Sequence, residues 1–471
     1  MSQDATTPPV AEHPNTSAVI KISIVAAFGG FLFGYDSAVI NGAVASIRTE
    51  FDIGAAVLGT TVASALLGAA VGAFFGGRIA DRLGRVPVMK IAAVMFLLSA
   101  LGCGLAYHLG WFILWRVVGG VAVGVASVIA PAYIAEVAPA AVRGRLGSLQ
   151  QLGIVLGIFV SLTIDALLAA WAGGADEPLW LGLEAWRWMF LAMAVPAVTY
   201  GIGAFAIPES PRYLVLAGRA DDARHVLTGL QGIVSANDRV QAIQQSVHSE
   251  RKPRMSDLRG RMAGLKPIVW VGIGLAALQQ FVGINVIFYY SNVLWQSVGF
   301  TEADSFTITV ITSVTNVVVT VVAIALVDKV GRRPLLLVGS TGMTLSLATL
   351  AVLFATADVV DGAPVLGPVA GPVALVAANL FVVFFGVSWG PMMWVLLGEM
   401  FPNAIRGAAL AVAGFVQWVA NFLVTVTFPP LAEASLGLAY GLYALFALVS
   451  LVFTIKMVRE TTGIELEDMQ D

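Results

Sequence analysis

Twelve long apolar stretches alternate with short polar segments along this chain of 471 residues. A helix needs roughly 20 residues to cross about 30 Å of hydrocarbon, and each stretch is close to that length. The hydropathy pattern therefore predicts twelve transmembrane helices, near residues 19–42, 57–77, 87–107, 111–133, 147–170, 186–207, 267–296, 305–327, 334–356, 372–397, 404–428 and 436–458.

A polar segment between the sixth and seventh stretches divides the chain into two groups of six predicted helices. It contains helix-like patches, for example at 220–230. The start of the chain is polar and proline-containing, which is typical of a disordered tail. The pattern predicts an N-terminal tail at 1–17, two six-helix bundles at 18–207 and 267–458, a linker with short helices at 208–266, and a C-terminal tail at 459–471.

Composition agrees with a membrane protein and excludes other classes. The chain is 58% hydrophobic and 12% charged, with a mean hydropathy of +0.87, whereas soluble domains carry about 25% charged residues. The single cysteine, Cys103, has no partner for an intramolecular disulfide. No nucleophile–base set, metal-ligand spacing or phosphate loop stands out. We expect no enzyme activity, no metal and no cofactor, and no basic patch indicates nucleic acid.

Most Lys and Arg residues fall in the segments on one side of the predicted helices, and the acids on the other side outnumber the cations there. The positive-inside rule then places both termini in the cytoplasm.

Charged motifs at the predicted cytoplasmic helix ends recur in the two halves. We expect Arg–carboxylate pairs there to form a cytoplasmic gate, because such bonds can hold two helices together and still break. The alternative is that the arginines only anchor the helices at the membrane surface. The predicted gate residues are Gly77, Arg78, Asp81, Arg82, Gly84, Arg85, Glu136, Arg143, Glu209 and Arg212 in the first half, and Asp328, Arg332, Arg333, Glu399 and Arg406 in the second.

Polar amides interrupt the seventh predicted helix. On a regular helix Asn285 would point away from Gln280, so Gln279, Gln280 and Asn285 can face one cavity only if the helix unwinds at Gly283. Discontinuous helices of this kind mark transporter sites, and amides offer a donor and an acceptor to hydroxyl groups. The alternative role for such amides is helix–helix contact, worth about 0.6 kcal/mol each.

Other helices carry similar features. Pro391 favours a local break in the tenth helix, next to Trp394, whose indole offers a flat apolar face and one donor. Gln417 and Asn421 share a face of the eleventh helix, and Gln151 lies in the fifth.

These motifs together resemble the major facilitator superfamily and, within it, the sugar porter family. The resemblance covers about residues 22–460 and includes Pro208–Arg212, Arg116–Gly120, Tyr133–Pro139 and Gln279–Asn285. It implies an all-α integral membrane fold of two pseudo-symmetric six-helix bundles, with a helical cytoplasmic loop between them, that rock about a central site.

The family motifs also assign roles. Phe33, Gln151, Gln279, Gln280, Asn285, Asn316, Trp394, Gln417 and Trp418 correspond to sugar-binding positions, and Tyr289 and Tyr290 to outer-gate aromatics. Gln417-Trp418 is similar to the proton-coupled xylose carriers of the family, whereas its facilitative glucose carriers have Asn-Trp there.

Asp36 is a carboxylate in an apolar predicted helix, which makes it a functional-site hypothesis. Arg116, in the fourth helix, needs an anion, and both Asp36 and Asp165 are available. Similarity to proton-coupled members of the family favours Asp36 as the partner and as the proton-coupling residue. Their second carboxylate, in the sixth helix, is replaced by Met193, and Asp165 in the fifth helix could supply a second proton acceptor in its place. The alternative is a static ion pair.

These observations lead us to expect a monomeric plasma-membrane carrier that takes up a monosaccharide, an aldose such as glucose, xylose or galactose, together with a proton. The alternatives are an uncoupled facilitator with the same site, a sugar-sensing receptor and a drug exporter. A receptor would need a long signalling tail, and an exporter an apolar cavity.

Overall fold

The computed structural model describes the chain except for residues 1–15, 232, 250–254, 361–362, 403–404 and 461–471. Twelve of its helices or helix pairs are long and apolar enough to cross a membrane, which confirms the predicted number and the all-α membrane fold. Most of the predicted N-terminal tail and nearly all of the C-terminal tail lie outside the described residues, and the first helix begins at Thr16.

The first six spans form one half of the molecule. Span one is divided into α1 (Thr16–Ala38) and α2 (Ile40–Glu50), and span six into α7 (Ala185–Ala192) and α8 (Ala194–Ala206). The others are single helices: α3 (Ala55–Leu83), α4 (Arg85–Gly104), α5 (Leu109–Val137) and α6 (Ala140–Ala172).

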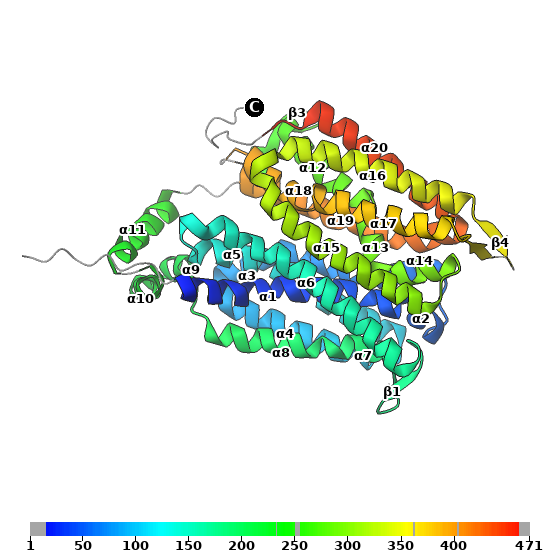
Figure 1. Cartoon of the computed structure of the whole chain (residues 1–471). Coiled ribbons are helices and arrows are strands. Elements are labelled where there is room, and N and C mark those ends of the chain that lie inside the picture. The colour runs from blue at the N-terminus through cyan, green and yellow to red at the C-terminus, as the bar shows by residue number, and fades with distance from the viewer. Residues whose placement is uncertain (1–15, 232, 250–254, 361–362, 403–404, 461–471) are drawn as a thin grey trace, which may run out of the picture.

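The last six spans form the other half, drawn above the first in Figure 1. Span seven is divided into α12 (Pro267–Phe281), α13 (Ile284–Tyr289) and α14 (Ser291–Ser297), and span ten into α17 (Ala370–Gly386) and α18 (Trp389–Met400). The others are α15 (Glu302–Val330), α16 (Arg332–Ala355), α19 (Arg406–Ala434) and α20 (Leu436–Met457).

Short helices link the halves at one end of the molecule: α9 (Pro211–Leu216), α10 (Ala220–Gln231) and α11 (Ile233–Ser249), followed by the 3-10 turn η1 (Met255–Leu258) and strand β3 (Arg259–Met262). The predicted helix over 220–230 is α10. It packs on its neighbours through a small apolar cluster that includes Leu214, Leu227 and Val240. We call this the linker end.

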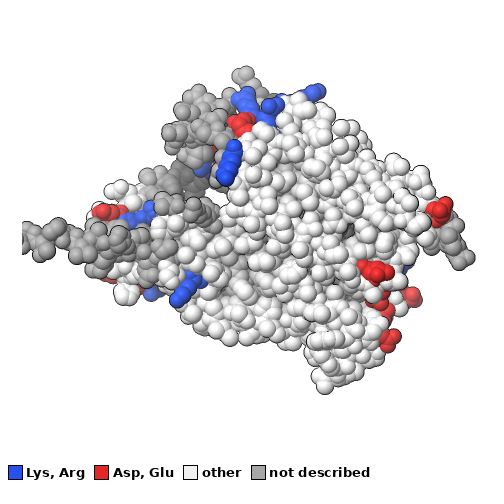
Figure 2. Space-filling view, in the orientation of Figure 1, with Lys and Arg blue, Asp and Glu red and all other residues white. Residues whose placement is uncertain are grey.

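Two short hairpins mark the opposite, hairpin end (Figure 1). β1 (Pro178–Trp180) pairs with β2 (Leu183–Glu184), and β4 (Asp358–Val360) with β5 (Ala363–Val365). The sequence did not predict them. In Figure 2 the blue Lys and Arg side chains gather toward the linker end and the red acidic side chains toward the hairpin end. This is the asymmetry expected of a protein oriented by the positive-inside rule.

Glycines bring α1 and α6 into backbone contact. A Cβ at Gly34 would lie 1.9 Å from the carbonyl oxygen of Ile154, and one at Gly157 would lie 2.0 Å from that of Phe31. Small residues on both helices therefore set the distance at which α1 runs along α6, which is a common arrangement in membrane proteins. As a result, the polar residues of α1 keep a fixed position relative to α6.

Candidate functional site

Span seven breaks at Gly283, as the sequence predicted. Gly283 has a φ of 82°, a left-handed conformation that separates α12 from α13. A Cβ at this position would lie 2.7 Å from the ring of Tyr443 in α20, so the site also needs the small residue. The break turns Asn285 back toward the amides at the end of α12.

Four amides form a continuous chain of hydrogen bonds around this break. Asn285 Nδ2 donates to Gln280 Oε1 (2.6 Å), and Gln280 Nε2 donates to Gln279 Oε1 (3.0 Å). Gln417 Nε2, from α19, also donates to Gln279 Oε1 (2.9 Å). The chain places the predicted amides of spans seven and eleven in one cluster, which we call the amide cluster.

Span ten is broken next to this cluster. Helix α17 ends at Gly386 and α18 begins at Trp389, so Pro391 lies in the first turn of α18, where its missing N–H costs no helical hydrogen bond. Gln279 Nε2 donates to the freed carbonyl groups of Trp389 (3.0 Å) and Gly390 (3.2 Å). The predicted break is present, three residues before the proline.

The remaining predicted sugar-binding residues lie on several helices. Trp394 is 45% exposed on α18, and its ring edge would be 3.8 Å from a Cβ at Gly414 in α19. Gln151 is half-buried on α6 and Asn316 is buried on α15. No hydrogen bond within the described part of the chain joins either amide to the amide cluster.

An aromatic contact joins the two halves near the amide cluster. The rings of Phe33 in α1 and Trp418 in α19 lie 5.9 Å apart, centroid to centroid. Trp418 follows Gln417 directly, so the contact connects span one to the helix that supplies one amide of the cluster.

Arg116 in α5 is paired with Asp36 in α1. Arg116 Nη1 lies 3.3 Å from Asp36 Oδ1 and donates to the Asp36 backbone carbonyl at 3.1 Å, and both side chains are buried. The second carboxyl oxygen of Asp36 and Nε of Arg116 have no partner among the described residues. The pair is incompletely satisfied, which makes the buried charged form of Asp36 costly.

The other half of the molecule reaches this ion pair through Tyr289. Its phenol is buried beside Ser37 and Asn421, within electrostatic range of Arg116 and Asp36. A cavity of about 10 Å³ lies among these groups and is lined by Ser37, Arg116 and Tyr289. Tyr290, the second predicted gate tyrosine, donates to the carbonyl oxygen of Thr425 at 2.9 Å.

Polar contacts join the halves at the hairpin end. Asn41 Nδ2 in α2 donates to the carbonyl oxygen of Phe288 (2.9 Å), and Asn41 Oδ1 accepts from the backbone N–H of Asn292 (3.1 Å). Arg48 Nη2 binds Glu433 Oε1 at 2.6 Å. These contacts close the hairpin end.

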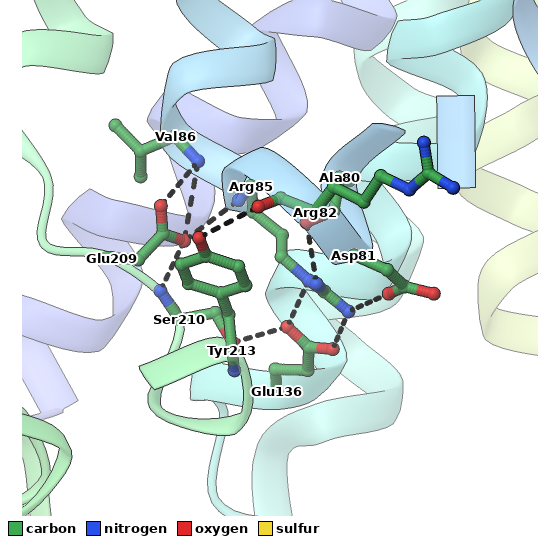
Figure 3. Close-up of polar contacts among 9 residues, drawn as sticks. All are labelled: Ala80, Asp81, Arg82, Arg85, Val86, Glu136, Glu209, Ser210 and Tyr213. Atoms are coloured by element: carbon green, nitrogen blue, oxygen red, sulfur yellow. Dashed lines mark hydrogen bonds and ion pairs between the residues drawn. The ribbon is translucent and has the colours of Figure 1, made fainter. Parts of the chain in front are cut away.

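At the linker end, Arg85 and Glu136 form the centre of a charged cluster in the first half (Figure 3). Arg85 Nε and Nη2 each donate to Glu136 at 3.0 Å, and Asp81 lies 3.1 Å from Nη2. Glu209 accepts the backbone N–H groups of Arg85 (2.9 Å) and Val86 (3.2 Å) at the start of α4. A carboxylate is favourable there because the helix N-terminus carries positive charge.

The second half repeats this arrangement. Arg332 Nη2 binds Glu399 Oε1 at 2.8 Å, and Glu460 accepts the backbone N–H groups of Arg332 and Arg333, both at 3.0 Å, at the start of α16. Glu460 therefore caps α16 as Glu209 caps α4.

Glycines with positive φ precede both capped helices, Gly84 at 102° and Gly331 at 94°. A Cβ on Gly84 would lie 2.4 Å from Glu209 Oε2, so the glycine leaves room for the capping carboxylate. This explains the predicted importance of Gly84. Gly77, by contrast, has only Val128 near its α-carbon.

The remaining predicted gate residues contact different parts of the chain. Glu136 and Glu399, near the ends of α5 and α18, bind Arg85 and Arg332 at the starts of α4 and α16. Arg406 Nε donates to the carbonyl oxygen of Phe401 instead. The side chains of Arg143 and Asp328 lie outside the described residues.

The remaining predicted cations make weaker or local contacts. Arg78 lies over the ring of Phe74 at 4.7 Å, and Arg333 Nη2 donates to the carbonyl oxygen of Ile455 (3.1 Å). Arg82 is exposed and contributes its backbone carbonyl, which accepts from the Tyr213 hydroxyl (3.2 Å). Arg212, at the start of α9, has further interactions. Arg78 and Arg82 form no ion pair within the described part of the chain.

Sequence reasoning missed several contributors to these contacts. Ser210 donates to Glu136. It also caps α9, because its side chain accepts from the backbone N–H of Tyr213. Asn41 joins the halves. A serine before a proline at a helix start is a recognisable cap signal, whereas a single asparagine in a span resembles ordinary helix contact.

Comparisons with known proteins agree with this geometry. The family model described as Sugar (and other) transporter matches residues 22–471. The chain is 57% identical to the glucose transport protein of Synechocystis sp., over 98% of this chain and 99% of the relative. It is 37% identical to the D-xylose-proton symporter of Escherichia coli, over 97% and 96%. A solved structure of the xylose transporter from E. coli in a partially occluded inward open conformation matches with a TM-score of 0.82 at 35% identity, covering 95% of this chain and 100% of that one.

Proposed function

This chain belongs to the sugar transporter family of the major facilitator superfamily, and we propose that it takes up a monosaccharide together with a proton. The proposed substrate is an aldose, because relatives in the comparisons are named for glucose and for D-xylose. In this proposal the carrier lies in a plasma membrane, with its linker end in the cytoplasm and its hairpin end outside the cell. It works as a monomer.

The amide cluster supports a neutral, hydroxyl-rich substrate. Gln280, Asn285 and Gln417 offer amide groups around Gln279, and none of them carries a charge that would select an ion. The indole of Trp394 is exposed on α18 and would face the C–H surface of a sugar ring. The amides of Gln151 and Asn316 would supply further hydrogen bonds.

The single observation that carries proton coupling is the buried Asp36–Arg116 pair. Protonation of Asp36 would remove the charge that holds Arg116, and Arg116 would then interact more freely with Tyr289 in the opposite half. Since Tyr289 lies next to the closed hairpin end, proton binding would bias the equilibrium between the two orientations of the carrier. Met193 is buried and cannot hold a second proton in span six.

The test compares wild type with Asp36→Asn in proteoliposomes. We expect wild type to accumulate sugar against its gradient and to alkalinise the external medium on sugar addition. Asp36→Asn should lose both, yet exchange labelled for unlabelled sugar, because exchange needs no net proton movement. Glu177→Asn, at an exposed acid, is the control and should behave as wild type.

Sugar uptake by wild type without proton movement would instead favour the uncoupled facilitator, which has the same site. Accumulation by Asp36→Asn would exclude Asp36 as the coupling residue.

A further inference from the structure

Asp165 is a second buried carboxyl group, separate from the Asp36–Arg116 pair. It lies on α6 with no exposed surface; the backbone of Gly42 in α2 is within reach of its carboxyl group, and neither carboxyl oxygen has a side-chain hydrogen-bond partner among the described residues. A Cβ at Gly42 in α2 would lie 2.8 Å from Asp165 Cβ and 2.7 Å from Met189 Sδ in α7. The phenol of Tyr35 in α1 lies within electrostatic range and donates to the Met189 carbonyl oxygen at 3.4 Å.

Three charged side chains on the helices around α6 bind groups other than Asp165. Arg116 of α5 is bound to the carboxylate of α1. Arg187 of α7 is bound to Glu184 and to a carboxylate of α2, and Glu302 of α15 accepts from the backbone of Ala175. In the part of the chain that the structure describes, Tyr35 is thus the titratable group that faces Asp165, and no cation pairs with it.

An ionised carboxylate in such a place would be an isolated charge in an apolar interior, which is among the most costly arrangements in a membrane protein. The carboxylic acid has no net charge. We propose that Asp165 is a second proton-binding residue of this carrier, and that it holds its proton in the arrangement closed at the hairpin end.

The position of Asp165 connects it to span one. Tyr35, which faces Asp165, and Asp36, which binds Arg116, are consecutive residues of α1. Gly34 fixes α1 against α6 one residue earlier. Any movement of α1 that separates Asp36 from Arg116 therefore also changes the packing around Asp165. Water reaching the carboxyl group would then accept its proton, leaving the carboxylate, and a proton from the other side would restore the acid. This role in the transport cycle rests on the proton-coupled function proposed above.

Infrared spectroscopy of the purified protein tests the protonation directly. A protonated carboxylic acid has a C=O stretch that is resolved from the bands of a carboxylate. The difference spectrum of wild type minus Asp165→Asn at neutral pH should contain this acid band. A difference that contains only carboxylate bands would overturn the proposal. This measurement does not depend on sugar transport, so it separates failure of the Asp165 proposal from failure of proton coupling.

Transport measurements test the role in the cycle. Asp165→Asn should carry fewer protons per sugar than wild type, because a proton-binding group is lost, and should retain sugar exchange. The control is Asp176→Asn, at an exposed acid of the loop after α6. An unchanged proton-to-sugar ratio in Asp165→Asn would contradict the proposal.

Two further outcomes are informative. Asparagine has the shape of the protonated acid, so an Asp165→Asn protein that fails to fold or to exchange sugar would count against an uncharged Asp165. A requirement of wild-type uptake for sodium, lost in Asp165→Asn, would identify a metal cation in place of the proton and would also overturn the proposal.

Discussion

Gln279 is the residue at which the amide cluster converges. Its oxygen accepts from Gln280 and Gln417, and its nitrogen donates to two backbone carbonyl groups freed by the break in span ten. One side chain thereby orients groups from spans seven, ten and eleven. Its replacement should disturb the cluster more than the loss of any other single amide.

We predict that Gln279→Leu weakens sugar binding about 10- to 100-fold. A leucine of similar size leaves the donors of Gln280 and Gln417 without their acceptor, at a cost of about 1–3 kcal/mol. Equilibrium binding of labelled sugar to the purified protein measures the change. Gln241→Leu, at an exposed position of α11, is the control. Equal affinity in the two variants would place the sugar elsewhere.

The charged and amide residues stand out in the sequence, but their partners do not. Asp36 and Arg116 were recognisable because ionisable side chains in apolar helices are rare. Whether Arg116 meets Asp36 or Asp165 depends on how α1 and α6 are rotated about their axes, and no local pattern records that rotation. Glu136 is likewise recognisable as an acid at a helix end, but its partner Arg85 lies at the start of α4, and nothing near Glu136 in the sequence identifies it.

The breaks within spans seven and ten are the elements that shape the site. Gly283 separates α12 from α13, and the freed backbone next to Pro391 receives Gln279. Both breaks could be predicted because glycine and proline have local backbone effects. The two hairpins could not, since strands of two or three residues are too short to show an alternating pattern.

We predict that Gly283→Ala lowers both thermal stability and sugar affinity. An alanine would have to adopt a left-handed conformation, at a cost of about 1–2 kcal/mol, and its Cβ would meet the Tyr443 ring at 2.7 Å. Relief of that contact would move α13 and with it Asn285. Melting temperature and sugar binding are measured on the same preparation.

Gly54→Ala is the matched control, because Gly54 has an ordinary φ of −75° and open space around its α-carbon. A Gly283→Ala protein as stable as this control would show that the backbone at the break is not constrained.

The whole molecule consists of two halves whose named polar contacts lie at the hairpin end. The charged clusters at the linker end, by contrast, each join helices of one half: Arg85 with Glu136, and Arg332 with Glu399. The sequence predicted the twelve spans and the repetition between halves. It could not predict which end is closed, because the same sequence must fit both orientations of a carrier.

We predict that Arg48→Gln shifts the carrier toward opening at the hairpin end. The Arg48–Glu433 pair is half-exposed, so its loss should change the equilibrium by about 0.2–1 kcal/mol, or up to about fivefold. Spin labels at His108 and Ala303, exposed at the hairpin end of each half, report the distance between the halves.

The double variant Arg48→Glu with Glu433→Arg restores opposite charges and serves as the control. It should return the distance distribution to that of wild type. A single variant that matches wild type at low salt would show that the pair does not hold the halves together.

The Arg48–Glu433 pair has one further consequence. Its two side chains belong to opposite halves and are accessible at the surface, so together they form an epitope that exists only while the hairpin end is closed. An antibody fragment raised against that epitope would act as a conformation-selective inhibitor: bound at the hairpin end, it would arrest transport without competing with the sugar.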